Sequence, residues 1–364
     1  MRIAVVLPRN MHFGPHGATS IDLCARDGVL HSRHGCAMTV ICADAPGLFD
    51  DVSLRRFHGR TTFGRVRAIA AIVREIGADL VIVHQHGPSA AGLARRLAPL
   101  PVALYMHNMP KPLRGPARAW RERDYRPLAG FIFVSHAARN AFDSLYPSLA
   151  APRFVVPNGI DPVGWEIAGP RRREILAVGR IDPHKGSIAI AEALRQVLPD
   201  HPQWQARFIG PLAPNARFRR AFAAATADVP RLQVEGAMPF EAVRDAALGA
   251  EIAVVASSRE GFGRVAVEAF AAGNALVSTR FGGLAEVIDD CALSLERGDA
   301  AEIARALDLL MRDADLRADL ARRGHARFLS HFTIETFAHA LDDTIATLRR
   351  QVALGAGPQE RPQR

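Results

Sequence analysis

Short apolar runs alternate along this chain with longer amphipathic stretches. A short apolar run bounded by turn residues is typical of a buried strand, and an apolar face that recurs every three or four residues is typical of a helix. The alternation therefore predicts β-α-β units throughout. Strands are expected at residues 3–7, 38–42, 52–57, 80–84, 102–106, 131–134, 175–178, 206–209, 232–234, 252–256 and 275–278. Expected helices include residues 18–31, 63–76, 187–198, 215–227, 240–248, 265–272 and 334–351.

The repeated units predict an α/β protein with two doubly wound, Rossmann-like domains, each built on a parallel sheet. A length of 364 residues agrees with two domains, because a single hydrophobic core seldom grows beyond about 250–300 residues. Residues 157–170, rich in Pro, Gly and Asp, are expected to link the domains. Residues 353–364 are expected to form a disordered tail. Ligands are expected beyond the carboxyl ends of the strands, in a central cleft that both sheets face.

The composition indicates a globular protein. Hydrophobic residues make up 49% of the chain, yet no apolar stretch reaches the roughly 18–20 residues that span a bilayer. The first expected strand begins so early that it leaves no room for a secretory signal. The cysteines Cys24, Cys36, Cys42 and Cys291 lack the spacing of a zinc site. We therefore expect reduced thiols and a cytoplasmic location.

The net charge of +9 belongs to the N-terminal half of the chain. Residues 1–165 hold 20 Lys and Arg against 11 Asp and Glu, whereas residues 166–364 hold 26 basic and 26 acidic residues. A one-sided basic surface attracts anionic partners such as membrane headgroups or phosphorylated glycans. Nucleic acid is disfavoured, because no binding motif accompanies the charge. The alternative is a merely arginine-rich protein, in which both halves would share the excess.

The segment Glu260-Gly-Phe-Gly-Arg-Val-Ala-Val-Glu268 follows the expected strand at 252–256 and carries a carboxylate on either side of a glycine turn. Gly261 and Gly263 would let backbone N–H groups approach a phosphate closely, and the acids would bind hydroxyl groups beside it. A strand-to-helix turn with solvent-facing acids is the structural alternative.

The expected strand at residues 175–178 is followed by Gly179-Arg180 and then by Lys185-Gly186. Two cations at a helix start suit a diphosphate, since arginine offers a planar fork and lysine a compact charge. Lysine occurs only twice against 44 arginines, at Lys111 and Lys185, so its use here hints that a compact ammonium is required. Chance usage is the alternative.

Taken in order, six segments resemble the retaining nucleotide-sugar glycosyltransferases of family 4, the glycosyl transferases group 1 with GT-B architecture. They are residues 78–86, 101–108, 155–161, the Arg180/Lys185 pair, the Glu260/Glu268 pair and residues 281–286. The resemblance implies an acceptor-side domain at residues 1–160 and a nucleotide-sugar-binding domain at residues 171–332. It also implies that a helix at residues 333–352 packs back on the first domain.

The resemblance implies roles for the residues around the donor. Arg180 and Lys185 would bind the donor's diphosphate and stabilise charge on the leaving group. Backbone N–H groups near Gly263, Arg264 and Val265 would share that load with the helix dipole.

Four further residues complete the expected site. Glu268 would bind the ribose hydroxyls. Glu260 would contact the transferred sugar and stabilise positive charge at its anomeric carbon, with a plain salt bridge as the alternative. His107 would lie near the donor sugar and the acceptor hydroxyl, or else be a strand-end histidine with a backbone partner. Gly14 would touch the donor phosphates, although its loop lacks the family's tandem glycines and is not the G-x-G-x-x-G of NAD-binding proteins.

No metal cofactor is expected, and the nucleotide sugar is a co-substrate. The Asp-x-Asp motif Asp313-Ala-Asp315 lies in a charged helical stretch and is explained by a solvated face. His84 and His86 form an H-x-H pair without a nearby third ligand, which favours packing or acceptor contact over metal binding.

Residues 111–126 hold six basic and two acidic residues, with Trp120 and Tyr125 among them. This composition fits an interfacial patch on anionic lipid or a seat for a phosphorylated acceptor. An ordinary solvated helix is the alternative.

The leading hypothesis is a metal-independent hexosyltransferase that acts on a glycan or lipid-linked acceptor in bacterial lipopolysaccharide or surface polysaccharide synthesis. It would be cytoplasmic and peripheral on the inner face of the membrane. The alternatives are a GT-B sugar-nucleotide epimerase and a non-catalytic sugar-nucleotide-binding module. Two positions depart from the family. Ser257 stands where proline is usual, and Arg264, which stands where an apolar residue is common, either adds charge near the phosphates or points outward.

Overall fold

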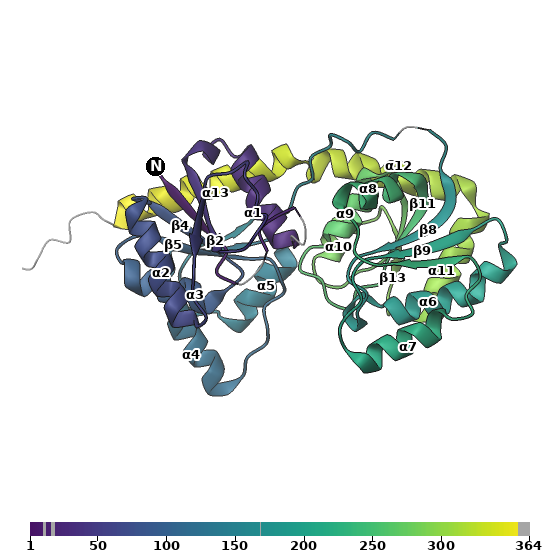
Figure 1. The fold of residues 1–364 in the computed structure, drawn as a ribbon, viewed down its shortest axis with the longest axis horizontal. Helices are drawn as coiled ribbons and strands as arrows, with labels where there is room; N and C mark the ends of the chain where they lie inside the picture. The colour runs from purple at the N-terminus through teal and green to yellow at the C-terminus, as the bar shows by residue number, and fades with distance from the viewer. Residues whose placement is uncertain (10–11, 16–18, 168, 356–364) are drawn as a thin grey trace, which may run out of the picture. The chain divides into compact units, whose positions relative to one another are not determined.

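The computed structural model describes residues 1–9, 12–15, 19–167 and 169–355. The chain forms two compact units: unit 1 is Met1–Gly159 with Ile334–Arg364, and unit 2 is Ile160–Thr333. Each unit contains a sheet whose neighbouring strands all pair in parallel (Figure 1). The predicted start of the disordered tail at residue 353 is wrong, because the last helix continues to Gly355; the rest of the predicted tail, from residue 356 onward, lies outside the described residues.

Unit 1 is built on a seven-stranded sheet in the order β3-β2-β1-β4-β5-β6-β7. The strand order reverses between β1 and β4, which makes this pair the topological switch point. The strands are β1 Ile3–Val6, β2 Met38–Ala43, β3 Leu54–Phe57, β4 Leu80–His84, β5 Val102–Met106, β6 Gly130–Phe133 and β7 Arg153–Val155. The helices are α1 Ser20–His31, η1 Gly35–Ala37, α2 Thr62–Glu75, α3 Gly87–Leu97, α4 Gly115–Tyr125, α5 His136–Leu145 and α13 Ile334–Gly355.

Helices cover both faces of this sheet, which explains why its central strands are apolar without alternation. One face carries α2, α3 and α5, whose fully buried side chains include Ile69, Leu93 and Phe142. On α1, Gly28 faces the C-terminal helix α13, and a Cβ at Gly28 would lie 3.1 Å from Leu341 Cδ2. Close packing of α13 against α1 makes the last helix of the chain part of unit 1.

Unit 2 is built on a six-stranded sheet in the order β10-β9-β8-β11-β12-β13, with its switch point between β8 and β11. The strands are β8 Arg172–Val178, β9 Gln205–Ile209, β10 Leu232–Glu235, β11 Ala250–Val255, β12 Ala275–Thr279 and β13 Leu293–Leu295. The helices are η2 Pro183–Lys185, α6 Ser187–Val197, η3 Leu198–Asp200, α7 Ala216–Thr226, α8 Phe240–Gly249, α9 Arg264–Ala271, α10 Leu284–Ile288, α11 Ala300–Arg312 and α12 Ala314–His331. Trp204, Phe208 and Leu307 are among its buried core residues.

The predicted fold class is confirmed, because two parallel α/β sheets are present. The expected strands form with small shifts at their ends; β3, for example, begins at Leu54 rather than at residue 52. The short edge strands β7 and β13 were not expected. Among the described helices, none is both long enough and apolar enough to cross a membrane.

Candidate functional site

Two loops meet at the switch point of unit 2. Strand β8 leads into the loop that carries Arg180 and Lys185, and its neighbour β11 leads into the loop that carries Glu260. A backbone hydrogen bond of 2.8 Å from Ser258 N to His184 O joins the loops. Gly186, with a φ of +68°, permits this closeness, since a Cβ there would lie 2.4 Å from the carbonyl oxygen of the residue after β11.

One ion pair joins the loop of the predicted cations to the loop of the predicted carboxylates. Lys185 Nζ donates to Glu260 Oε2 at 2.5 Å, and the two side chains are 29% and 21% exposed. The salt bridge that the sequence left open as an alternative is therefore present. An ammonium has three donors and a carboxylate has several lone pairs, so both groups keep capacity for a ligand.

Asp182, which was not among the predicted site residues, organises the cationic loop. Its buried carboxylate accepts hydrogen bonds from the backbone N–H groups of His184 (2.8 Å) and Lys185 (3.1 Å). It also accepts from Arg180 Nε at 2.5 Å, while the Arg180 side chain stays 64% exposed. An aspartate directly before a proline at a helix start is a capping signal that was available in the sequence.

Helix α9 begins at the glycine turn as predicted. Gly263 is its N-cap with a φ of +111°, and the first intrahelical bonds run from Ala266 N and Val267 N to Gly263 O. The N–H groups of Arg264 and Val265 therefore precede the helical ladder, at the positive end of the helix dipole.

The second carboxylate, Glu268, lies on α9 and pairs with Arg264 on the same helix. Arg264 Nε donates to Glu268 Oε1 at 3.1 Å, and the two side chains are 12% and 13% exposed. The suggestion that Arg264 points outward is therefore wrong. Burial raises the pKa of Glu268, and the charges of Arg264 and Lys185 oppose that rise. The role of Glu268 toward a ribose stays a prediction.

A third loop, between β12 and α10, packs against the Glu260 loop. Gly283 N donates to Glu260 O at 3.0 Å. A Cβ at Gly283 would lie 2.3 Å from Gly261 O, and a Cβ at Gly263 would lie 2.5 Å from Leu284 Cδ2. The start of α10 thus forms a wall of the site, in the segment 281–286 that the sequence had singled out.

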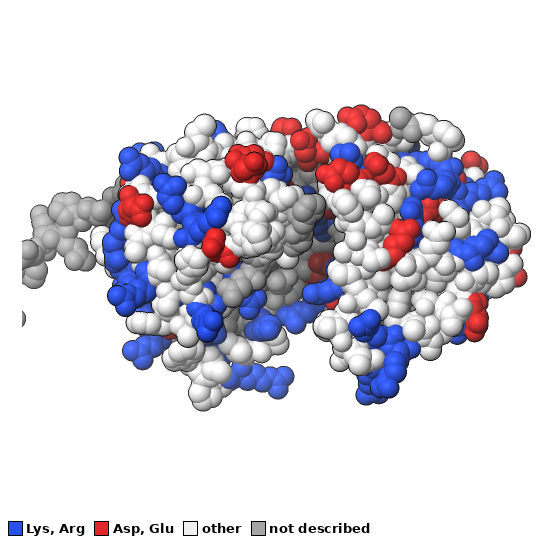
Figure 2. All heavy atoms as spheres, viewed as in Figure 1, with Lys and Arg blue, Asp and Glu red and all other residues white. Residues whose placement is uncertain are grey.

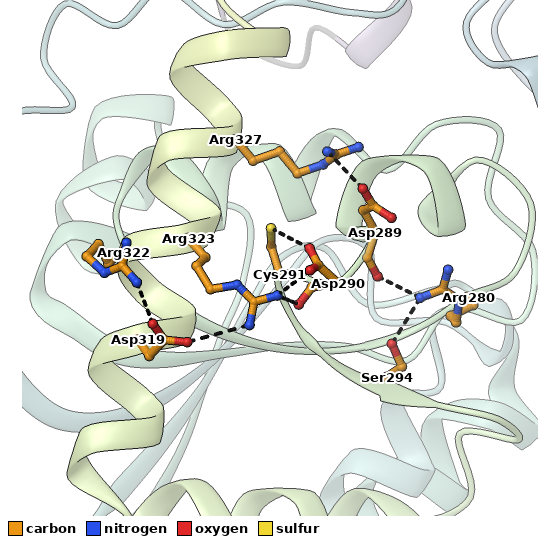
Figure 3. Close-up of polar contacts among 9 residues, drawn as sticks. All are labelled: Arg280, Asp289, Asp290, Cys291, Ser294, Asp319, Arg322, Arg323 and Arg327. Atoms are coloured by element: carbon orange, nitrogen blue, oxygen red, sulfur yellow. Dashed lines mark hydrogen bonds and ion pairs between the residues drawn. The ribbon is translucent and has the colours of Figure 1, made fainter.

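Arginines of α12 contact the end of α10 and the residues that follow it (Figure 3). Arg327 donates to Glu286 O (2.7 Å) and Val287 O (2.8 Å), and it pairs with Asp289 at 3.1 Å. A second arginine of α12, Arg323, pairs with Asp290 at 2.7 Å and so also ties α12 to the segment after α10. The other contacts drawn in Figure 3 lie within one side of this junction; they involve Arg280, Asp289, Cys291, Ser294, Asp319 and Arg322.

In unit 1, His107 follows strand β5 and lies beside His84 at the end of β4. His84 Nδ1 and His107 Nε2 share a hydrogen bond of 2.9 Å, and the rings stack with centroids 5.0 Å apart. Burial lowers the pKa of His84 to about 3, and burial together with His84 holds the pKa of His107 well below its usual value. Both rings are therefore neutral near pH 7. The side-chain partner of His107 is another histidine, a pairing that the sequence analysis missed.

Gly14 follows β1, where its Cα packs on the Gly47 carbonyl so closely that a Cβ would lie 2.1 Å from Gly47 O. Its role toward donor phosphates stays a prediction, and part of its loop, residues 16–18, lies outside the described residues. Asp313 caps α12 by accepting from Leu316 N at 2.8 Å, so its position has a structural reason other than a solvated face. In the part of the chain that the structure describes, no group of three His, Cys, Asp or Glu side chains could hold a metal ion.

The Lys185–Glu260 pair lies at the switch point of a doubly wound sheet, which is where such sheets bind their ligands. The model of the glycosyl transferases group 1 matches residues 167–327, and that of glycosyltransferase family 4 matches residues 30–163. The chain belongs to the family 4 glycosyltransferases, which confirms the resemblance seen in the sequence, and its two units have the GT-B architecture.

Individual relatives extend this result. The glycogen synthase of Mycobacterium tuberculosis is 31% identical over 255 residues, a stretch that covers 67% of this chain and 57% of that protein. The lipopolysaccharide core biosynthesis glycosyltransferase LpsE of Rhizobium meliloti is 34% identical over 99 residues, 27% of this chain and 29% of that protein. The crystal structure of Anabaena HepE in complex with UDP superposes with a TM-score of 0.77 at 18% identity, over 95% of this chain and 100% of that one.

Proposed function

We propose that this protein is a retaining hexosyltransferase that moves a sugar from a nucleotide-diphosphate donor to a glycan or lipid-linked acceptor. The observation that carries the proposal is the Lys185–Glu260 ion pair beside the N-terminus of α9. A diphosphate, which brings negative charge to this point, competes with Glu260 for the ammonium group. Retention of configuration is carried over from the family.

In the proposed reaction the acceptor oxygen bonds to the anomeric carbon while the bond from that carbon to the diphosphate oxygen breaks. The nucleoside diphosphate leaves with the electron pair, and its departing oxygen takes the proton of the acceptor hydroxyl. Arg180, Lys185 and the first N–H groups of α9 stabilise that negative charge. Glu260, once Lys185 has turned to the diphosphate, stabilises positive charge at the anomeric carbon. His107, neutral near pH 7, contributes hydrogen bonds rather than charge.

We place the reaction in bacterial lipopolysaccharide or surface polysaccharide synthesis, in the cytoplasm and at the inner face of the membrane. Two observations support this assignment: the stretch shared with LpsE, and the excess of basic residues in the first half of the chain, which suits an anionic surface. No metal is required in the proposed reaction, because cationic side chains and a helix terminus neutralise the diphosphate.

The test is a thermal-shift screen of the full chain against UDP, GDP, ADP, CDP and their common sugars, with EDTA present. A ligand at 100 times its dissociation constant stabilises the folded protein by about 2.7 kcal/mol. We expect one nucleoside diphosphate to raise the melting temperature, and Lys185→Ala to weaken its binding by at least about tenfold.

Lys111→Ala is the matched control, because it removes the chain's other lysine from an exposed position in unit 1. It should bind the nucleotide as the wild type does. If no nucleoside diphosphate or sugar stabilises the folded wild-type protein, or if binding appears only when manganese replaces EDTA, the proposal is wrong in its donor or in its independence of metal.

A further inference from the structure

Arginines from three segments of unit 1 gather around the start of α3. Arg9 follows β1 and His86 follows β4, so both lie just beyond the switch point of this sheet. Helices α2 and α4 each pack against α3, and they carry Arg65 and Arg121. Figure 2 shows basic side chains gathered over the part of unit 1 where Figure 1 places α2 and α4.

Arg65 is fixed on the α2 side. Its Nη2 donates to Thr62 Oγ1 at 3.3 Å. A Cβ at Gly59 would lie 2.8 Å from Arg65 Cγ, so the loop before α2 packs against the aliphatic part of the Arg65 side chain. Its Nε is buried and has no hydrogen-bond partner among the described residues. A buried guanidinium donor without an acceptor carries an energetic cost, which Arg65 bears in this structure.

Arg121 is fixed on the α4 side through Tyr125. The Arg121 guanidinium lies 5.7 Å from the centre of the Tyr125 ring. The Tyr125 hydroxyl lies against Gly87, the first residue of α3, where a Cβ would come within 2.3 Å of it. The contact chain from Arg121 through Tyr125 to Gly87 places the guanidinium beside the N-terminus of α3.

These arginines lack compensating carboxylates. The nearest acids on α4 are engaged elsewhere: Glu122 with Ser148, and Asp124 with Arg95 at 2.9 Å. Over the described ranges no ion pair includes any of the three arginines. Like charges that converge from separate segments repel one another, so the arrangement favours a bound anion.

The three arginines also affect the pKa of the His86 imidazole. His86 caps α3, and its Nδ1 shares a hydrogen bond of 2.7 Å with the buried Ser89 Oγ. Burial, followed by the positive charges of Arg9, Arg65 and Arg121, lowers the pKa of His86 to about 4. His86 is therefore neutral near pH 7, and all the positive charge around it comes from the arginines.

We propose that Arg9, Arg65 and Arg121, together with the N-terminus of α3, bind a phosphate group of the acceptor. A guanidinium matches phosphate oxygens in a bidentate manner, and a helix N-terminus adds backbone donors. This inference rests on the proposed function, and it narrows the acceptor from any glycan or lipid-linked sugar to one that carries a phosphate.

The experiment titrates inorganic phosphate and a sugar phosphate monoester into the full chain by calorimetry. The donor site is saturated with the nucleoside diphosphate that the thermal-shift screen identifies. The double variant Arg65→Gln/Arg121→Gln should bind phosphate about 10–100-fold more weakly than the wild type, because two charge-assisted contacts are lost. The matched control Arg67→Gln/Arg123→Gln removes the same charge from exposed positions on the same two helices and should bind as the wild type does.

Vesicles of phosphatidylcholine with and without phosphatidylglycerol distinguish the source of the phosphate. Binding of the soluble monoester identifies a phosphorylated glycan, whereas arginine-dependent binding to the anionic vesicles alone identifies a lipid headgroup. Equal loss in both double variants, or no binding of either probe by the wild type, overturns the proposal. Nucleotide stabilisation measured in the same samples tests the proposed function separately, since the donor residues are untouched.

Discussion

At the scale of single residues, the positions of Arg180 and Lys185, the cations proposed to bind the donor, depend on one carboxylate. Asp182 bonds to the backbone of the turn that carries Lys185 and to the Arg180 guanidinium. It thereby orders both cations before any ligand binds, and such preorganisation is what makes charge stabilisation effective. The residue acts through its neighbours and is a positioning residue.

We predict that Asp182→Asn weakens binding of the nucleoside diphosphate about tenfold. The amide keeps one acceptor for the turn but loses the charge that holds Arg180, and a lost cap costs about 1 kcal/mol of stability. Titration calorimetry and a melting curve measure the two effects separately.

Asp299→Asn is the control, because Asp299 caps α11 and pairs with Arg297 in the same pattern. It should lower stability by a similar amount and leave nucleotide binding unchanged. Equal binding by both variants would reduce Asp182 to an ordinary helix cap.

At the scale of elements, α12 fixes the wall of the site through Arg327. Besides its bonds to the end of α10, its guanidinium lies 5.7 Å from the centre of the Phe332 ring. Phe332 packs edge-on against Phe262, with ring centroids 5.7 Å apart, and Phe262 belongs to the Glu260 loop. Arg327 therefore reaches the site by two routes, one through α10 and one through an aromatic contact.

Arg327→Lys should weaken nucleotide binding several-fold and destabilise unit 2 by about 1–3 kcal/mol. Lysine keeps the charge but cannot donate to two carbonyls in the fixed fork of a guanidinium. Melting temperature and nucleotide affinity are the measurements. The control is Arg322→Lys on the same helix, where the side chain is 72% exposed and pairs with Asp319. Loss of stability with unchanged affinity would show that the wall is not coupled to the site.

The hydrophobic pattern of the sequence predicted the strands and helices that bury long apolar runs. It did not predict strands whose apolar run is only a few residues long. Strands β7 and β13 have three residues each at sheet edges, too few to show a period. The site loops followed from glycines and charges at strand ends, whereas Asp182 was overlooked because a capping side chain looks like a turn residue. The His84–His107 pair depends on register: His84 lies opposite Tyr105, which a single sequence does not reveal.

At the scale of the whole molecule, the buried histidines make stability depend on pH. His84, His86 and His107 all have a lower pKa in the folded protein than the value of about 6.5 in an unfolded chain. Below that value the unfolded chain takes up protons that the folded protein refuses, so stability falls as the pH falls. Between pH 6.5 and pH 5 the three histidines together should cost about 5 kcal/mol.

Most of the stability loss in this pH window comes from the histidines, although Asp22 and Glu268, whose pKa values are raised by burial, oppose it. Carboxylates such as Asp51, Asp308 and Asp319 have a lowered pKa in the folded protein, so their contributions persist until the pH approaches about 4. Denaturant unfolding at pH 7, 6 and 5 should therefore show a stability loss that comes mainly from the histidine rings.

The variant His84→Asn places an amide near the position of Nδ1, where it can still hydrogen-bond to His107, and it removes one titrating ring. It should reduce the loss between pH 6.5 and pH 5 by about a third, because His86 and His107 still titrate. His58→Gln removes a histidine whose side chain is 82% exposed and should leave the loss unchanged. A wild-type stability that is flat over this range would mean that the pair takes up a proton in the folded protein. In that case His107 would carry positive charge toward an acceptor instead of the neutral hydrogen bond proposed above.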